Sequence, residues 1–562
     1  MAPGLVVEEV EDVTPLPSSI KLTPVELNIQ RMLLDVAQYI DTESPNDNVE
    51  GQASLPKELR EQKLCLRITG GWVRDKLLGV PSVDIDVAIN KMTGFQFGLR
   101  MKEYLEIPGN LEKYGLESIA DSEKLSAKAG ATDKSKMVGG LHKIEANPEK
   151  SKHLETTTVR ILGLDIDLVN LRKETYSDDS RNPQMEFGTP EEDALRRDAT
   201  VNAMFYNMNT QKVEDLTGKG YDDMQKKILR TPLEPYQTFK DDPLRVLRLI
   251  RFAARLGYTI EDEALVAMGN SDIKDALHRK ISRERVGTEL EKALKGPDPH
   301  EALRLIFELD LYDTIFADPS VDRADHYTPD VTHWRIIIDA VREMYESEGT
   351  VSQHLMRDKE ELYLAWQLAA MIPYRDAPQP EGDPGKKPPP PISVVVVREG
   401  IKATNKVCDA LNLSIRHQNE IAISVDRLYQ QKRRPEKQFE GEDLTSRSVL
   451  GMAIRRWGPT WRSQVFYALL VEIADSQDVE GTERKYGAFI KHIETLELLD
   501  AYSIKSLLDG KQLAKALATP PGPWMKDALD VVMAWQLRNP GQTDPTAAID
   551  AVRAHQNHGK SA

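Results

Sequence analysis

Residues 64–89 read LCLRITGGWVRDKLLGVPSVDIDVAI, and this stretch decides the fold expected for the N-terminal part of the chain. Its apolar start predicts a short strand over 64–69, and Gly70-Gly71 then forces a turn. A short helix is expected over 72–78. Acidic and apolar residues alternate over 83–89, which predicts a second strand directly after the helix.

Two carboxylates, Asp84 and Asp86, stand out in the second predicted strand. Side chains at positions i and i+2 of a strand share a face, so both acids should face one way while Ile85 and Val87 are buried. Carboxylates that close repel each other unless a cation lies between them, and oxygen ligands that leave room for phosphate suit Mg²⁺. Such a site can activate an attacking hydroxyl and stabilise a leaving phosphate oxygen. Asp84 and Asp86 are therefore the predicted catalytic and metal-binding residues.

The turn before the short helix supplies further candidates. Gly70 and Gly71 let backbone N–H groups approach a phosphate, and Arg74 places a cation nearby. The alternative interpretation is an acid pair on a solvated strand face. The double glycine followed by an arginine favours a nucleotide-binding site over that alternative.

A second constellation lies in residues 241–252, DDPLRVLRLIRF. Three arginines, Arg245, Arg248 and Arg251, recur every three residues of a predicted helix and form a positive ridge. Such a ridge suits a triphosphate. Pairing of these arginines with acidic neighbours is the alternative.

Asp242 and Arg245 could also recognise a base. Cytosine and adenine present an amino donor beside a ring acceptor, which a carboxylate next to a guanidinium matches. Uracil and guanine reverse that order, and mis-pairing a buried polar group costs about 1–3 kcal/mol per contact. Because Asp-Pro is also an ordinary helix start, Asp242 as a helix cap remains an equal interpretation of the residues alone.

Beyond these stretches the local patterns predict several elements. Helices are expected to begin at Thr23-Pro24 and at Thr189-Pro190, each with a glutamate placed for a capping box. Residues 121–153, rich in Lys, Ser, Ala and Gly, predict a mobile loop. The linker expected over 41–56 and the proline-rich insertion or linker over 376–391 should contain no helix or strand.

A hairpin is expected over 156–171, with its turn at Gly163. It carries Asp165 and Asp167 on one face. One of them could be a third metal-binding carboxylate, and pairing with Arg160 or with Arg172 is equally open.

The composition limits the class of protein. The chain has 562 residues, of which 40% are hydrophobic and 29% charged, and no apolar run is long enough to cross a membrane. Its two cysteines, Cys65 and Cys408, form neither a disulfide framework nor a zinc site. A net charge of −16 argues against nonspecific nucleic-acid binding, so any RNA site must concentrate positive charge locally. Basic candidates are 432–434 and 455–457, for which solvated helix faces are the alternative.

Taken together, the motifs resemble the CCA-adding enzymes, which are tRNA nucleotidyltransferases of the polymerase beta superfamily, and most closely the fungal members of the bacterial-eukaryotic class. The metal motif matches 70–86, the ribose motif RRD-x-x-x-NA matches 196–203, and the base-reading motif matches 241–245. A connecting motif matches 215–224 with two departures, Lys219 between the glycines and Met224 in place of leucine. A neck motif matches 282–290, so the resemblance covers roughly residues 60–300.

The resemblance implies roles for particular residues. Asp84 and Asp86 bind Mg²⁺, Asp242 and Arg245 read the base, and the nucleotide is held by Gly70, Gly71, Arg74, Arg197, Arg248 and Arg251. It also implies an α+β fold with a mixed-sheet head and a helical neck, body and tail in a seahorse shape. The expected divisions are an N-terminal helix and linker, the head, the neck, the body and a tRNA-binding tail, over 1–60, 61–235, 236–300, 301–430 and 431–562.

The implied activity is addition of CCA to the 3′ end of tRNA from CTP and ATP, with release of pyrophosphate. A poly(A) polymerase-type RNA nucleotidyltransferase is the enzymatic alternative, because it shares the metal and ribose motifs. An RNA-binding module with a decayed site is the alternative from another class, and the intact acids and arginines speak against it. The expected compartments are cytoplasm and nucleus, with the mitochondrion as a further one, although no import signal follows Met1. No membrane and no obligate protein partner are expected.

Overall fold

The computed structural model describes residues 17, 19–43, 59, 61–116, 142–144, 156–177, 180–321, 327–381, 388–434 and 443–558. They belong to two compact units, Met1–Ser282 and Arg283–Ala562. This division falls inside the predicted neck, and the finer division into five parts stays a prediction.

The first unit is built on a seven-stranded mixed sheet. Its strand order is β3-β4-β5-β2-β1-β8-β9, in which β2 and β5 run parallel and the other neighbouring pairs are antiparallel. The predicted mixed-sheet head is therefore confirmed. The strands are β1 (Leu66–Thr69), β2 (Ile85–Ile89), β3 (His142–Ile144), β4 (Thr156–Ile161), β5 (Leu164–Asn170), β8 (Phe205–Asn207) and β9 (Lys212–Glu214).

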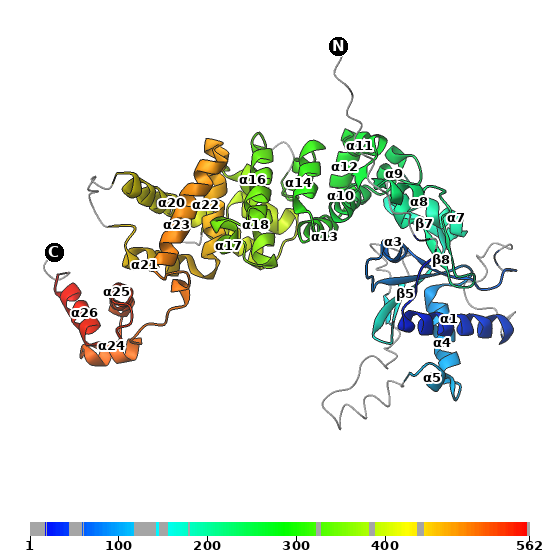
Figure 1. The fold of residues 1–562 in the computed structure, drawn as a ribbon, viewed down its shortest axis with the longest axis horizontal. Helices are drawn as coiled ribbons and strands as arrows, with labels where there is room; N and C mark the ends of the chain where they lie inside the picture. The colour runs from blue at the N-terminus through cyan, green and yellow to red at the C-terminus, as the bar shows by residue number, and fades with distance from the viewer. Residues whose placement is uncertain are drawn as a thin grey trace, which may run out of the picture. The chain divides into compact units, whose positions relative to one another are not determined.

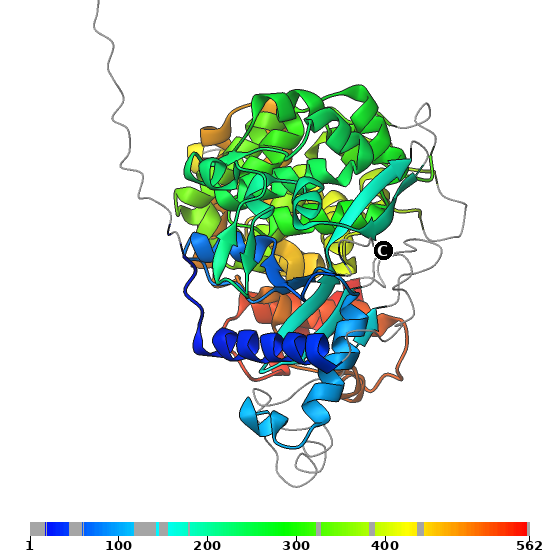
Figure 2. The same ribbon diagram turned by 90° about the vertical axis from the view of Figure 1, so that its right-hand side faces the viewer.

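Two small strand pairs and a set of helices complete this unit. The antiparallel hairpin β6–β7 spans Arg172–Ser177 and Ser180–Phe187, and the parallel pair β10–β11 spans Ile228–Leu229 and Thr259–Ile260. Helices α1 and α4 pack against the sheet and each other (Figures 1 and 2). The helices are α1 (Pro24–Glu43), α3 (Gly71–Leu77), α4 (Gly94–Glu106), α5 (Asn110–Lys113), α7 (Pro190–Leu195), η3 (Thr200–Asn202), α8 (Gly220–Gln225), α9 (Pro235–Asp241), α10 (Leu244–Leu256), α11 (Asp262–Met268) and α12 (Ser271–Lys280).

Local sequence signals account for the starts of several elements. Thr23 and Glu26 exchange hydrogen bonds of 2.7 and 3.3 Å at the start of α1, and Thr189 and Glu192 do the same at α7. Both predicted capping boxes are confirmed. The predicted hairpin is also confirmed, because Gly163, with a φ of 81°, turns β4 into β5.

Two predictions were wrong in detail. Helix α1 runs on to Glu43, past the predicted start of the linker at residue 41, and the Thr42 hydroxyl donates to the backbone oxygens of Gln38 and Tyr39 in this last turn. Residues 142–144 form β3 inside the predicted loop, because β4 offers an open sheet edge to pair with. The rest of that predicted loop, residues 121–141 and 145–153, lies outside the described residues.

The second unit is helical throughout its described residues, as expected for neck, body and tail. Its core is formed where α20 packs against α22, and a separate cluster of buried residues joins α24, α25 and α26. The α-helices are α13 (Arg283–Leu294), α14 (Pro299–Glu308), α15 (Tyr312–Ile315), α16 (Trp334–Glu346), α17 (Thr350–Leu355), α18 (Lys359–Met371), α19 (Ile392–Val395), α20 (Asn405–Arg433), α21 (Arg447–Trp457), α22 (Trp461–Ser476), α23 (Val479–Thr495), α24 (Gly510–Ala516), α25 (Trp524–Arg538) and α26 (Thr546–His558).

Short helical turns lie between these helices. They are the 3₁₀ turns η5 (Ile372–Tyr374), η7 (Gly458–Thr460) and η8 (Ala501–Ser503) and the π turn η6 (Val396–Gly400). The proline-rich stretch has no helix or strand over 376–381 and 388–391, as predicted, and 382–387 lie outside the described residues.

Candidate active site

Asp86 lies in β2, beside the turn that joins β1 to α3. A Cβ added to Gly70 would lie 3.5 Å from Oδ2 of Asp86 and 3.6 Å from Nη1 of Arg197. Gly70 also has a φ of 75°, which side-chain-bearing residues rarely adopt. The structure therefore brings together Gly70, Asp86 and Arg197, three of the residues expected from the sequence.

Asp84 lies immediately before β2 and is exposed, so its predicted place inside the strand was wrong. Residues 80–84, which include Pro81, form no helix or strand, and pairing with the neighbouring strands starts only at Ile85. The charge of Asp84 nevertheless acts on Asp86, as the pKa of Asp86 shows.

Asp167 of β5 lies opposite Asp86 in the parallel pair β2–β5. Its Oδ1 accepts a hydrogen bond of 2.6 Å from Thr158 of β4. Burial raises the pKa of Asp86 to about 6, with a further contribution from the charge of Asp167, an opposing one from Arg197 and a smaller one from Asp84. Asp165 is exposed and pairs with Arg160 at 3.7 Å. Of the two acids considered as a third carboxylate, Asp167 therefore lies beside Asp86, whereas Asp165 pairs with an arginine.

This carboxylate group fits a divalent cation. The raised pKa of Asp86 reflects negative charge that Arg197 only partly offsets, and a bound cation would remove that excess. Among the described residues no set of three or more His, Cys, Asp and Glu side chains converges as a complete metal site. Hard divalent cations commonly bind one or two carboxylates and complete their shell with substrate phosphates and water.

Arg197 is held by a buried acid that also holds its neighbour. Asp193 is 1% exposed, and its two oxygens accept hydrogen bonds from Arg196 at 2.6 Å and from Arg197 at 2.8 Å. Although burial opposes it, these guanidinium groups hold the pKa of Asp193 below its ordinary value. Arg197 also lies over the Phe205 ring, so its orientation near Asp86 is fixed by two contacts.

Arg74 is buried beside Gly71 rather than exposed. It donates to Oδ1 of Asp75 through Nε at 2.9 Å and Nη2 at 2.6 Å, and Nη1 makes a short hydrogen bond to Asn202. The other oxygen of Asp75 accepts a hydrogen bond of 3.0 Å from Arg255 of α10. Asp75 therefore joins α3 to the C-terminal turns of α10, a link that the sequence did not reveal.

The arginines of α10 point into the same network. Arg248 donates to Asp198 at 2.6 Å, and Arg245, which is 8% exposed, donates to the backbone oxygen of Arg196 at 2.7 Å. Although burial opposes it, Arg248 and Arg245 hold the pKa of Asp198 at about 2. Arg251 lies over the Phe252 ring at 4.4 Å. For Arg248, the alternative of pairing with an acidic neighbour is realised.

Asp242 lies between α9 and α10. Its Oδ1 accepts a hydrogen bond of 3.2 Å from the backbone of Leu244, so a capping contact is present. Its backbone oxygen accepts from the backbone N–H of Arg245 at 3.1 Å, which brings the two predicted base-reading residues to one turn.

The two basic stretches of the C-terminal unit differ. Arg455 donates to backbone oxygens of Ala501 and Ile504, Arg456 pairs with Glu420, and Trp457 is fully buried. Arg455 and Trp457 therefore contribute to packing, whereas the Arg456 side chain is 57% exposed. Residues 432–434 lie exposed at the end of α20.

A mixed sheet whose paired strands gather carboxylates beside a glycine turn, with arginines arriving from a following helix, defines a nucleotidyltransferase. A family model described as "Poly A polymerase head domain" matches residues 66–230, and one described as "Probable RNA and SrmB- binding site of polymerase A" matches 257–325. The chain is 37% identical to "CCA tRNA nucleotidyltransferase, mitochondrial" of Saccharomyces cerevisiae, over 93% of this chain and 92% of that protein. It belongs to the family of CCA tRNA nucleotidyltransferases.

Two further comparisons cover nearly the whole chain. The chain is 41% identical to "Nucleotidyltransferase lcsQ" of Purpureocillium lilacinum, over 96% of this chain and 92% of that protein. The fold is similar to that of the Thermotoga maritima CCA-adding enzyme, solved in complex with tRNA, with a TM-score of 0.58 and 17% identity over 95% and 96% of the two chains. No helix in the described part of the chain is long and apolar enough to span a membrane.

Proposed function

We propose that the protein adds CCA to the 3′ end of tRNA, using CTP twice and ATP once. The observation that carries the proposal is the similarity to a CCA tRNA nucleotidyltransferase along nearly the whole chain, in a protein whose Asp86, Gly70 and Arg197 lie together. In each step the 3′-hydroxyl oxygen of the RNA bonds to the α-phosphorus of the nucleotide. The bond between the α-phosphorus and the oxygen that bridges it to the β-phosphorus breaks. Pyrophosphate leaves, and the hydroxyl proton passes to solvent.

Asp84 and Asp86 are the proposed ligands of Mg²⁺, with Asp167 as a third carboxylate beside Asp86. When bound, Mg²⁺ lowers the pKa of the attacking hydroxyl and stabilises the charge on the leaving pyrophosphate. No separate general base is required. The residues of this chain hold the cation, bind the triphosphate and exclude wrong bases.

The triphosphate is proposed to lie along the glycine turn. Gly70 and Gly71 offer close backbone approach, and Arg74 and Arg197 supply fixed positive charge because Asp75 and Asp193 orient them. Arg248 and Arg251 extend the positive surface along α10. Arg248 already pairs with Asp198, which fixes the orientation of the guanidinium that would attract the triphosphate.

Base selection is proposed to rest on Asp242 and Arg245. The carboxylate accepts from an exocyclic amino group, and the guanidinium donates to a ring acceptor, as cytosine and adenine require. The nearby backbone contact to Leu244 holds the Asp242 carboxylate in place, so the capping contact and base recognition are compatible.

The direct test is extension of a tRNA that ends at its discriminator base, with nucleotides supplied singly and together. We expect two additions with CTP alone, none with UTP or GTP, and three with CTP and ATP. Failure to incorporate CTP would refute the proposal.

A poly(A) polymerase-type activity is the second candidate, because the family model that matches 66–230 is named for polymerases of that kind. Such an enzyme would extend RNA with ATP alone and add little with CTP alone. The same assay therefore separates the two activities.

The proposed compartments are cytoplasm and nucleus, together with the mitochondrion. Relatives from Saccharomyces cerevisiae and Candida glabrata carry mitochondrial names, which supports the last of these. Imaging of a C-terminally tagged chain with organelle markers tests the proposal.

A further inference from the structure

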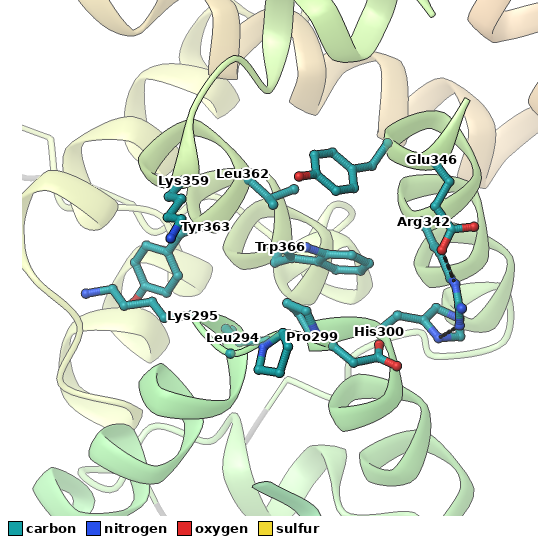
Figure 3. Close-up of a pocket in the computed structure, with 14 residues that line it drawn as sticks. Leu294, Lys295, Pro299, His300, Arg342, Glu346, Lys359, Leu362, Tyr363 and Trp366 are labelled. Carbon is teal, nitrogen blue, oxygen red and sulfur yellow. Dashed lines mark hydrogen bonds and ion pairs between the residues drawn. The ribbon is translucent and has the colours of Figure 1, made fainter. Parts of the chain in front are cut away.

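The C-terminal unit contains a pocket of about 530 Å³ that has no part in the chemistry described above. It lies where the end of α13 and the start of α14 meet α16 and α18. Its volume falls in the range of pockets that hold small organic ligands. Figure 3 shows Trp366 in the middle, with Tyr363 and Lys359 to one side and His300, Arg342 and Glu346 to the other.

The pocket is lined by aromatic rings suited to a planar ligand. Trp366 is 3% exposed, yet its indole N–H makes no hydrogen bond within the described part of the chain. The N–H is accessible at the pocket, so it can donate to an acceptor on a bound ligand. Tyr345 leaves 45% of its surface exposed at the same pocket, and Tyr363 adds a third ring.

Positive charge borders these rings. Lys359 is exposed and forms no ion pair among the residues that the structure places, so its ammonium is available to an anion. Lys295 lies over the Tyr363 ring at 4.8 Å. The two acids of the lining already have partners: Glu346 accepts from Arg342, which also lines the pocket, at 2.8 Å, and Asp298 caps α14 through the backbone of Glu301 at 2.9 Å.

Aromatic faces, an unused N–H donor and an available ammonium together match a base and its phosphate. We propose that this pocket binds one nucleotide of the RNA substrate, with the base stacked among the aromatic rings and the phosphate at Lys359. The inference rests on the proposed function only for the identity of the RNA.

Two observations favour RNA over a free nucleotide. The wall formed by residues 294–300 lies within 257–325, the segment matched by the family model described as an RNA-binding site. The exposed positions of Tyr345 and Lys359 also leave the pocket accessible to a polymer.

The test is the affinity of the full chain for a tRNA that lacks CCA, measured by fluorescence anisotropy at fixed salt. Lys359→Glu and Tyr345→Ala change exposed positions, and a glutamate is favourable at the start of α18, so both variants should fold. Each is expected to raise Kd for tRNA about 5- to 30-fold, the scale of one stacked base, while KM for CTP stays unchanged. Tyr345→Phe, which keeps the ring, should bind as the unaltered protein does.

Lys102→Glu is the matched control, because it reverses an exposed lysine on α4 and should leave tRNA binding within about twofold. Equal Kd values for Lys359→Glu, Tyr345→Ala and the unaltered chain would overturn the proposal. Since binding is measured without nucleotides, this result is independent of whether CCA is added. A chain that binds tRNA through the pocket but adds no CCA would refute the proposed function alone.

A second measurement separates RNA from a free nucleotide. In equilibrium dialysis with AMP, the unaltered chain and Lys359→Glu should bind the same number of molecules. A fall by one in the variant would assign the pocket to free nucleotides and overturn the RNA assignment. Cross-linking of 4-thiouridine-containing tRNA to Tyr363 or Trp366 would support it.

Discussion

Asp86 of β2 faces Asp167 of β5 across the parallel pair at the centre of the sheet. The contact places two acids side by side, and together with burial it raises the pKa of Asp86 to about 6. Two carboxylates this close repel each other unless a cation is bound. The sheet therefore favours binding of a cation at the point where a triphosphate is expected.

Metal affinity should therefore depend on pH in a defined direction. Below about pH 6 the Asp86 carboxyl is protonated and must lose its proton to bind a cation, so the affinity should fall up to tenfold per pH unit. The metal-free chain should become more stable as the pH falls through about 6. The reason is that the raised pKa of Asp86 makes the folded state bind this proton more tightly than the unfolded state does. Calorimetric titration with Mg²⁺ or Mn²⁺ between pH 5 and 8 measures the effect, which Asp86→Asn should abolish.

Asp84→Ala should reduce nucleotide addition by at least about 10³-fold, because several kcal/mol of transition-state stabilisation are lost with a metal ligand. Asp84 is exposed, so the free energy of unfolding should change by less than about 0.5 kcal/mol. Single-turnover extension of tRNA and urea unfolding measure the two quantities. A variant that extends tRNA at the normal rate would show that Asp84 is no ligand.

Asp167→Asn tests the third carboxylate. The amide keeps the shape of the side chain but removes a charge beside Asp86, so the pKa of Asp86 should fall and addition should slow by about 10²-fold. Asp165→Asn on the same strand is the matched control, since Asp165 is exposed and pairs only weakly with Arg160. Equal rates for both variants would assign Asp167 a structural role through its bond to Thr158.

Asp242→Ala should weaken rejection of UTP more than it weakens triphosphate binding. Loss of one discriminating contact of about 1–3 kcal/mol corresponds to about 5- to 150-fold in the CTP to UTP ratio of kcat/KM. Asp241→Ala, at the end of α9, provides the comparison. If UTP is still refused while stability falls, Asp242 serves only as the cap that its contact with Leu244 suggests.

Asp75→Asn should destabilise the first unit by about 3 kcal/mol, because it removes a buried charge that holds both Arg74 and Arg255. KM for CTP should rise as well, since Arg74 loses the acid that orients it beside Gly71. Asp222→Asn breaks only an exposed pair with Lys226 and should change neither quantity measurably. Thermal unfolding and initial rates provide the readouts.

The elements that local patterns define were predictable. The strand around 66–69, the hairpin that turns at Gly163 and the starts of α1 and α7 follow from periodicity, from a turn glycine and from capping boxes. Asp84 was misplaced because strand ends depend on where a partner begins to pair, which the spacing of charges does not encode.

Relationships between distant segments were not predictable. Asp167 becomes a neighbour of Asp86 only through the parallel pairing of strands whose partners lie 81 positions apart, and Arg255 meets Asp75 across 180 positions. Asp75 lies within the stretch that matches the metal motif, yet nothing in the neighbouring sequence indicated that it would bind Arg255 of α10. The pocket around Trp366, assembled from four helices, left no sequence signal at all.

The bridge made by Asp75 has a consequence for attempts to redesign this enzyme. Because one carboxylate holds a guanidinium from each of two helices, a substitution that turns or shifts α10 also pulls on the segment beside Gly71. New base preferences introduced on α10 would therefore disturb phosphate contacts unless compensating changes were made in α3, so the two helices need to be varied together in any selection for altered tail sequences.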